Sequence, residues 1–196
     1  MYKVFIIILL WGCSLFAYNE LSVTAPGEHG ATKPGYIERV LLVVQPHCGY
    51  VEQSLYIYYT DRNQYPDDYL LEICHSFNLP EQSVVNDMWL WIGDSVMQAK
   101  MFEVKEAQGI YDSIVGDRMD PAFLKKKNQQ YTLSVYPFNS GEYRKVKINF
   151  IHPVNWIGNK CIVSLPIVML NAAANSELPL HVFFKKDTNA WVNPEF

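Results

Sequence analysis

The sequence lacks the spaced residue sets that mark most enzymes and metal-binding proteins. It has no His-Glu-x-x-His motif, no Gly-x-Ser-x-Gly step, no phosphate-binding loop and no glycine-rich dinucleotide fingerprint. No two histidines stand four residues apart, as paired zinc ligands on one helix face would; the five are His29, His47, His75, His152 and His181. The sequence therefore predicts no catalytic residue, no cofactor-binding residue and no metal site.

Cysteine is also scarce, and its spacing excludes the common zinc and redox motifs. The four cysteines are Cys13, Cys48, Cys74 and Cys161, and no two of them form a Cys-x-x-Cys pair. If Cys13 belongs to a cleaved leader, three remain in an oxidising compartment. One disulfide and one buried thiol among Cys48, Cys74 and Cys161 would then be possible, and the sequence leaves the pairing open.

Charge is sparse, and no basic face is indicated. Charged residues make up 18% of the chain and its net charge is −4, whereas an average soluble domain is about 25% charged. A nucleic-acid partner is not expected, because such proteins usually carry a basic patch. The longest like-charge run, Lys125-Lys126-Lys127, is interpreted as a solvated turn and not as a phosphate or lipid contact. A hydrophobic content of 49% with thirteen tyrosines favours a well-packed, strand-rich domain.

Only the N-terminus carries a long apolar run. Lys3 is followed by the unbroken apolar stretch Val4 to Leu10, and small residues lead up to Ala17. This pattern predicts a secretory signal peptide cleaved after Ala17, and the run is short for a membrane span. As an alternative, residues 10–13 resemble a bacterial lipoprotein box in which Cys13 would be lipidated, although Trp11 fits that motif poorly. We expect a secreted, periplasmic or cell-surface protein.

The stretch Met88 to Arg118 predicts a hairpin followed by a helix. Gly93-Asp94 separates two apolar runs and suits a type II′ turn. That turn would pair Trp91 with Val96 and Leu90 with Met97. Side chains alternate along a strand, so one face would carry Met88, Leu90, Met97, Ala99 and Met101, and the other Trp89, Trp91 and Val96. Apolar residues then recur at helical spacing from Val104 to Val115.

The rest of the chain reads as short strands separated by turns. Strands are expected at Ile37–Val44, Ser54–Thr60, Tyr69–Phe77, Tyr131–Tyr136, Tyr143–Ile151, Lys160–Leu165 and Leu180–Lys185, with Ile167–Leu170 as a possible continuation. The predicted fold is mainly β, an antiparallel β-sandwich with a short helical insert. The predicted organisation is a signal peptide at 1–17, an extended lead-in at 18–35, the sandwich domain at 36–170, and at 171–196 the truncated start of a following segment.

Residues 77 to 153 resemble the VIT (vault protein inter-alpha-trypsin) domain. That family has a strand ending in a Leu-Pro step, an Ile-Gly-Asp turn, and a helix with an Ala…Tyr pattern. An Asp-Pro-Ala-hydrophobic-Leu step follows, and then a hairpin with a Gly-Glu turn and a closing Phe-x-x-Pro step. Their counterparts here are Leu79-Pro80, Ile92-Gly93-Asp94, Ala107 with Tyr111, Asp120 to Leu124, Gly141-Glu142 and Phe150 to Pro153. Gly109 inside the helix departs from the pattern, and strands before Tyr69 match only loosely.

The resemblance implies a secreted or surface module without enzymatic activity. VIT domains usually stand before a von Willebrand factor A domain, whose metal-dependent adhesion site begins Asp-x-Ser-x-Ser. That motif is absent from these 196 residues. We therefore expect the N-terminal part of a larger protein, with a protein partner or a downstream domain of the same polypeptide as its contact.

Two functional hypotheses remain on sequence grounds. The first is a non-enzymatic protein-interaction module that supports adhesion or assembly. The alternative is a secreted carbohydrate-binding or hydrolytic β-sandwich that uses Trp89 and Trp91 as a binding stripe and Glu103 and Glu106 as an acid–base pair. Burial of the two tryptophans under the helix is the simpler interpretation, and an exposed helix face explains the two glutamates. We favour the first hypothesis.

Overall fold

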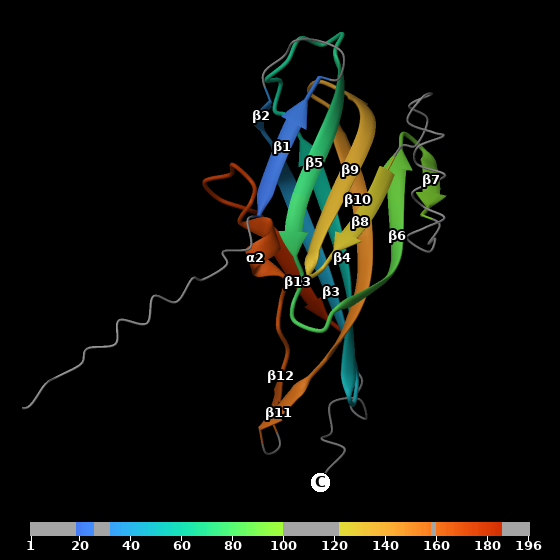
Figure 1. Ribbon diagram of the computed structural model, residues 1–196, viewed down its shortest axis with the longest axis vertical. Coiled ribbons are helices and arrows are strands. Elements are labelled where there is room, and N and C mark those ends of the chain that lie inside the picture. Colours follow the sequence, from blue (N-terminus) through green and yellow to red (C-terminus); the bar gives the residue numbers. More distant parts are fainter. Residues whose placement is uncertain (1–18, 26–31, 100–121, 158–159, 186–196) are drawn as a thin grey trace, which may run out of the picture.

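The computed structural model describes residues 19–25, 32–99, 122–157 and 160–185 (Figure 1). The described residues form two β-sheets that lie face to face, together with a small separate hairpin and one short helix. The predicted β-sandwich is therefore confirmed. The helix predicted between Val104 and Val115 lies outside the described residues.

The five-stranded sheet has the order β2-β1-β5-β9-β8 and the six-stranded sheet has the order β13-β3-β4-β10-β6-β7. Strands of the first sheet are β1 (Glu20–Thr24), β2 (Lys33–Pro34), β5 (Leu70–Asn78), β8 (Ala122–Lys127) and β9 (Gln130–Asn139). Strands of the second are β3 (Tyr36–His47), β4 (Tyr50–Thr60), β6 (Val84–Ile92), β7 (Ser95–Gln98), β10 (Tyr143–Pro153) and β13 (Leu180–Phe184). The separate hairpin is β11 (Asn155–Ile157) with β12 (Lys160–Ile162), and the helix is α2 (Ile167–Leu170).

Alternation of side chains along the strands builds most of the core between the sheets. In β4, Leu55, Ile57 and Tyr59 are fully buried, while the residues between them face outward. In β10, Val146 and Ile148 are buried in the same way. Figure 1 shows the five-stranded sheet lying over the six-stranded sheet, so each sheet covers the apolar face of the other.

The predicted β6–β7 hairpin is confirmed residue by residue. Leu90 pairs with Met97 and Trp91 pairs with Val96, the register predicted from a two-residue loop. Gly93 has a φ of 55°, the left-handed value that a type II′ turn requires at its first central position. The core face of β6 carries Met88 and Leu90, both buried, and its tryptophans point the other way.

The segment predicted as an extended lead-in, residues 18–35, instead contributes β1 and β2 to the five-stranded sheet. Strand β1 pairs antiparallel with β5 along its whole length, and its Leu21 and Val23 are buried in the core. The surrounding Pro and Gly residues indicated a loop, but the alternation of Leu21 and Val23 with polar neighbours is an ordinary strand pattern. Residues 167–170, a possible strand continuation, form α2, where the Asn171 amide donates to the carbonyl of Ile167.

The sheet also continues beyond the domain boundary predicted at residue 170. Strand β13 pairs with β3 and is parallel to it, the one parallel pairing among the described strands. Leu180 and Val182 pack against the core cluster. Residues up to 184 thus belong to the sandwich and not to a separate following segment. No helix in the described part of the chain is long and apolar enough to span a membrane.

One buried histidine ties the two sheets to α2. The Tyr59 hydroxyl lies 2.8 Å from Nδ1 of His75, and Nε2 of His75 lies 3.1 Å from the carbonyl oxygen of Met169. A carbonyl can only accept, so Nε2 carries the proton and Nδ1 accepts from Tyr59. Burial lowers the pKa of His75 to about 4, so the ring is neutral at pH 7.

Candidate functional site

The outward surface of the six-stranded sheet carries aromatic and cationic side chains in alternation. We call it the aromatic–cationic face. It consists of Arg39 on β3, Tyr56 and Tyr58 on β4, Trp89 and Trp91 on β6, and Lys145 and Lys147 on β10. On β4, β6 and β10 the residues between them, such as Ile57, Leu90 and Val146, are buried in the core, so the pleat of these strands places the face residues outside.

The strand register arranges the face as two parallel rows. Lys145 lies between Tyr58 on β4 and Trp91 on β6, and one pleat further along β10 Lys147 lies between Tyr56 and Trp89. Each row is thus a tyrosine, a lysine and a tryptophan on three adjacent strands. Both lysines are half-buried by their aromatic neighbours.

Both ammonium groups lie over tryptophan rings. The Nζ atom of Lys145 is 3.9 Å from the ring centroid of Trp91, and that of Lys147 is 4.0 Å from the centroid of Trp89. Tyr56 adds a longer contact of 5.4 Å to each. Such contacts contribute about 0.5–1 kcal/mol each at exposed sites. They hold the two positive charges in place without neutralising them.

No carboxylate in the described part of the chain forms an ion pair with Lys145 or Lys147. The carboxylates on the same three strands already have partners. Glu52 lies 3.6 Å from His47, and Asp87 accepts hydrogen bonds from the Gln98 side chain and the Met88 amide. The centre of the face therefore carries two lysine charges that have no ion-pair partner among the described carboxylates, on a chain whose net charge is −4.

A hollow of about 260 Å³ adjoins the Lys147 row. Lys185 reaches over it from the end of β13 and donates to Oε1 of Gln45 at 2.6 Å. Asn149, 7% exposed, borders it from β10, and its Oδ1 atom has no hydrogen-bond partner within the described residues. The lining side chains are Val43, Gln45, Glu52, Ser54, Tyr56, Lys147, Asn149 and Lys185.

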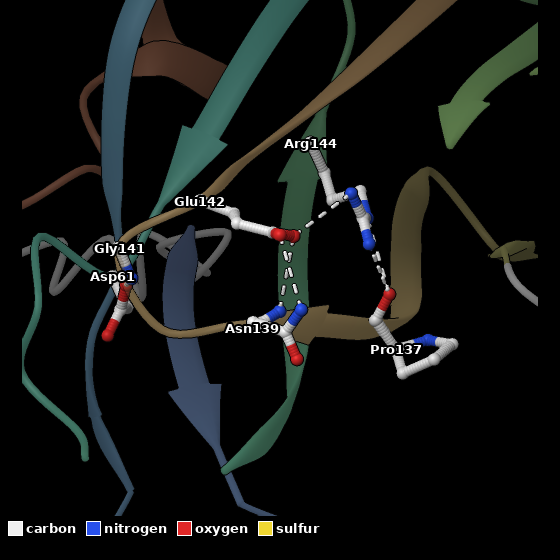
Figure 2. A network of polar contacts seen from close by, with 6 residues as sticks. All are labelled: Asp61, Pro137, Asn139, Gly141, Glu142 and Arg144. Atoms are coloured by element: carbon white, nitrogen blue, oxygen red, sulfur yellow. Dashed lines mark hydrogen bonds and ion pairs between the residues drawn. The ribbon is translucent and has the colours of Figure 1, made fainter. Parts of the chain in front are cut away.

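A second polar cluster, centred on Asp61, fixes a loop. Figure 2 shows Asp61 beside Gly141, whose amide donates to Oδ1 at 2.8 Å; the Ser140 hydroxyl lies 2.6 Å from Oδ2. Burial would raise the pKa of Asp61, but hydrogen bonds from Ser140 and from the amides of Gly141, Tyr65 and Asn63 bring it below its usual value. The carboxylate is occupied by these donors, so its role is to hold the loop after β4 against the β9–β10 turn.

The same turn is held from its other side by Arg144. Figure 2 shows its guanidinium donating to the carbonyl of Pro137, with Nη2 at 2.9 Å, and approaching Glu142 at 3.5 Å. The Asn139 side chain donates to the same glutamate. These contacts use up the polar groups of the turn, so we interpret the whole cluster as structural.

Some of the predicted candidate residues lie within the described part of the chain and others lie outside it. Trp89 and Trp91 share the outward face, as the hairpin register predicts, and both are half-buried there. Glu103 and Glu106 lie outside the described residues, as does Cys13. Cys74 and Cys161 are free thiols, so neither is joined to Cys48, and burial raises the pKa of both. Within the described ranges, no group of three or more His, Cys, Asp and Glu side chains is placed to hold a metal ion.

Sequence reasoning missed the lysines and tyrosines of the rows. The alternation of Lys145 and Lys147 with Val146 and Ile148 already predicts that the lysines face outward. Their contact with the tryptophans depends on β10 lying between β4 and β6, a pairing between segments more than fifty residues apart that no local pattern encodes.

Two larger proteins are among the solved structures with partial similarity. A zinc metallopeptidase of the M1 class from Deinococcus radiodurans, in a variant bound to a Tyr-Ser-Ala substrate, matches with a TM-score of 0.35 and 7% identity, covering 66% of this chain and 23% of that one. A candidate protease from Parabacteroides distasonis matches with a TM-score of 0.27 and 10% identity, covering 60% and 22%. This chain spans less than a quarter of either neighbour.

No match is found among curated proteins. The family model of the vault protein inter-alpha-trypsin domain, by contrast, matches residues 51–150. That range runs from the start of β4 to Phe150 in β10 and includes Trp89, Trp91, Lys145 and Lys147. Membership of this family supports an interaction module of the extracellular type. The chain belongs to the vault protein inter-alpha-trypsin (VIT) domain family.

Proposed function

We propose that this VIT domain is a non-enzymatic protein-interaction module of the cell surface or extracellular space. Its aromatic–cationic face binds a protein partner or another domain of the same polypeptide, and thereby supports adhesion or assembly. The observation that carries the proposal is the pair of Tyr–Lys–Trp rows, whose lysines have no carboxylate partner within the described residues.

The composition of the face supports protein binding. Tryptophan and tyrosine are enriched in the centres of protein interfaces, because they supply large contact areas with few rotatable bonds. Here Trp89, Trp91, Tyr56 and Tyr58 are held by strands of a packed sheet, so little conformational entropy is lost on binding. The lysines add positive charge, which supports specificity and fast association.

The geometry supports a protein partner over the alternative of a sugar-binding or hydrolytic surface. Sugars stack on open faces of aromatic rings, but one face of each tryptophan here is occupied by a lysine ammonium group. Hydrolysis would need two convergent carboxylates. Among the described residues, the hollow beside the face has a single carboxylate, Glu52, which lies 3.6 Å from His47.

Secretion agrees with the family and with the predicted signal peptide at residues 1–17, which lie outside the described part of the chain. Lipidation at Cys13 would instead tether the same module to a membrane surface. In either case the face would meet its partner outside the cytoplasm.

Site-specific photo-cross-linking in the cells that make the protein tests this proposal. A benzophenone side chain would replace Val96, which is exposed, pairs with Trp91 and takes no part in the rows. The control position is Ser134, in the five-stranded sheet. We expect a discrete protein adduct from position 96 and none from position 134. The same adducts from both positions, or a glycan adduct alone from position 96, would overturn the proposal.

A further inference from the structure

We infer that the partner presents an extended acidic segment, and that carboxylates at alternate positions of this segment bind Lys145 and Lys147. This inference rests on the proposed function and names the chemistry of the partner.

The charges at the centre of the face are complementary to an acidic segment. Lys145 and Lys147 lack carboxylate partners in the described structure, whereas Glu52 and Asp87 already have partners. An ammonium group has three donors, so each lysine can keep its tryptophan contact and still receive a carboxylate from above. The neighbouring rings leave both lysines only partly exposed, so such an ion pair is stronger than one in bulk solvent.

The spacing of the lysines selects an extended conformation. Residues two apart on one strand lie about 6.6–6.8 Å apart on the same face, and Lys145 and Lys147 are two apart on β10. An extended acidic segment that runs along β10 presents its alternate side chains at the same interval. A helix presents neighbouring side chains of one face about 5–6 Å apart, a shorter interval than that of the two lysines, so an extended segment matches the rows more closely.

The hollow lies next to the second row, where a bound segment that follows β10 would end. A segment that follows β10 from Lys145 past Lys147 reaches the hollow bordered by Asn149 and Lys185. The buried Oδ1 of Asn149 is an acceptor for a donor group of the segment, such as a peptide N–H. Lys185, which donates to Gln45, also lines the hollow. The end of the segment fits here.

Titration of the full chain with synthetic octapeptides tests the inference, with tryptophan fluorescence as the readout because both rows contain one. The probe alternates serine and glutamate, and a second peptide of the same composition groups its glutamates together. We expect the alternating peptide to bind at least tenfold more tightly than the grouped one, and its binding to weaken as salt concentration rises.

The variant K145Q/K147Q should weaken the alternating peptide at least tenfold. The matched control is K125Q/K127Q, two exposed lysines on β8 in the other sheet, which should leave binding unchanged. Lys147→Arg keeps the charge and should retain most of the affinity, which separates loss of charge from misfolding. Equal binding by wild type and K145Q/K147Q, or no binding by wild type, would overturn the inference.

Titration with a heparin-derived hexasaccharide tests whether the anionic partner is a sulfated glycan and not an acidic peptide. If it binds with the same dependence on Lys145 and Lys147 while the alternating peptide does not, the acidic-peptide inference is wrong and the face binds sulfated glycans. The Val96 cross-linking result remains independent of these titrations. A protein adduct at Val96 without peptide binding rejects this inference alone and leaves the proposed function standing.

Discussion

Two polar side chains in the interior, His75 and Asp61, show how the sandwich accommodates ionisable groups at positions where burial disfavours the charged form. His75 is kept neutral by burial and is bonded on both ring nitrogens. Asp61 is kept ionised by hydrogen bonds that outweigh its burial. In both cases removing a partner would leave a buried polar group unsatisfied, which costs about 1–3 kcal/mol.

We predict that His75 makes the domain less stable in mild acid. Its pKa is about 4 in the folded chain, against about 6.5 in the unfolded chain. The unfolded chain therefore binds more protons between these values, and stability is lost as the pH falls from about 6.5 toward 4, by up to about 3 kcal/mol. Urea unfolding across this range measures the loss.

The variant His75→Gln isolates this contribution. Burial also lowers the pKa of His152, which contributes to the slope in the same direction, so the informative quantity is the difference between the two chains. Wild type should show the steeper loss of stability toward pH 4. Identical slopes would mean that His75 does not titrate differently in the folded and unfolded states.

We predict that Asp61→Asn lowers the free energy of unfolding by about 2–3 kcal/mol at pH 7. The substitution keeps the shape but replaces one acceptor oxygen with an NH₂ group that faces the donors of Ser140 or Gly141. Asp68→Asn is the control, because Asp68 is exposed in the same loop. Equal and small losses in both variants, measured by urea unfolding, would refute a special role for Asp61.

At the level of elements, the β6–β7 hairpin depends on Gly93. Its φ of 55° lies in the left-handed region, where an alanine side chain costs about 1 kcal/mol. We predict that Gly93→Ala destabilises the domain by that amount and that Gly93→Asn costs less, because asparagine tolerates this region better.

Gly49→Ala provides the matched control for the hairpin. An added methyl group meets no neighbouring atom within 4 Å at Gly49 or at Gly93, so crowding is equal and only the backbone conformation differs. Thermal unfolding of the three variants should place Gly93→Ala lowest and Gly49→Ala near wild type. The same melting temperature for the two alanine variants would contradict the turn assignment.

The elements also show which parts of the fold a sequence encodes locally. Gly93-Asp94 sets the loop length, and the loop length sets the register of Trp89 to Gln98, so this hairpin was predictable in detail. The short strand β1 was hidden because Pro26, Gly27 and Gly30 follow it closely. The sequence of α2 is also compatible with a strand continuation, because four apolar residues carry no period that separates the two states.

The candidate site divides in the same way. The outward position of Trp89 and Trp91 follows from alternation within one hairpin. The lysine rows require β10 to insert between β4 and β6, which the core enforces through contacts such as those of Val146 and Ile148. The order of β4, β10 and β6 in the sheet is decided by the packing of both sheets together. No single stretch of the sequence therefore predicts it.

For the whole molecule, the last described segment closes the six-stranded sheet. The Asn175 side chain accepts from the Ile37 amide at 2.9 Å and donates to the Ile37 carbonyl at 2.8 Å. The Val40 amide donates to the carbonyl of Pro179. Strand β13 then continues along β3 as its parallel neighbour. The segment from 171 to 185 thus satisfies the outer edge of β3.

We predict that a chain ended after Leu170 is less stable than one ended after Lys185 by at least about 3 kcal/mol. The shorter chain loses the Asn175 clamp, the ladder between β13 and β3, and the burial of Leu180 and Val182. It also exposes the edge of β3, an apolar strand that would then promote aggregation. Urea unfolding of both chains, with light scattering to follow association, measures the difference. Equal stability and equal solubility would mean that β13 only rests on the sheet, and that the domain does end near residue 170.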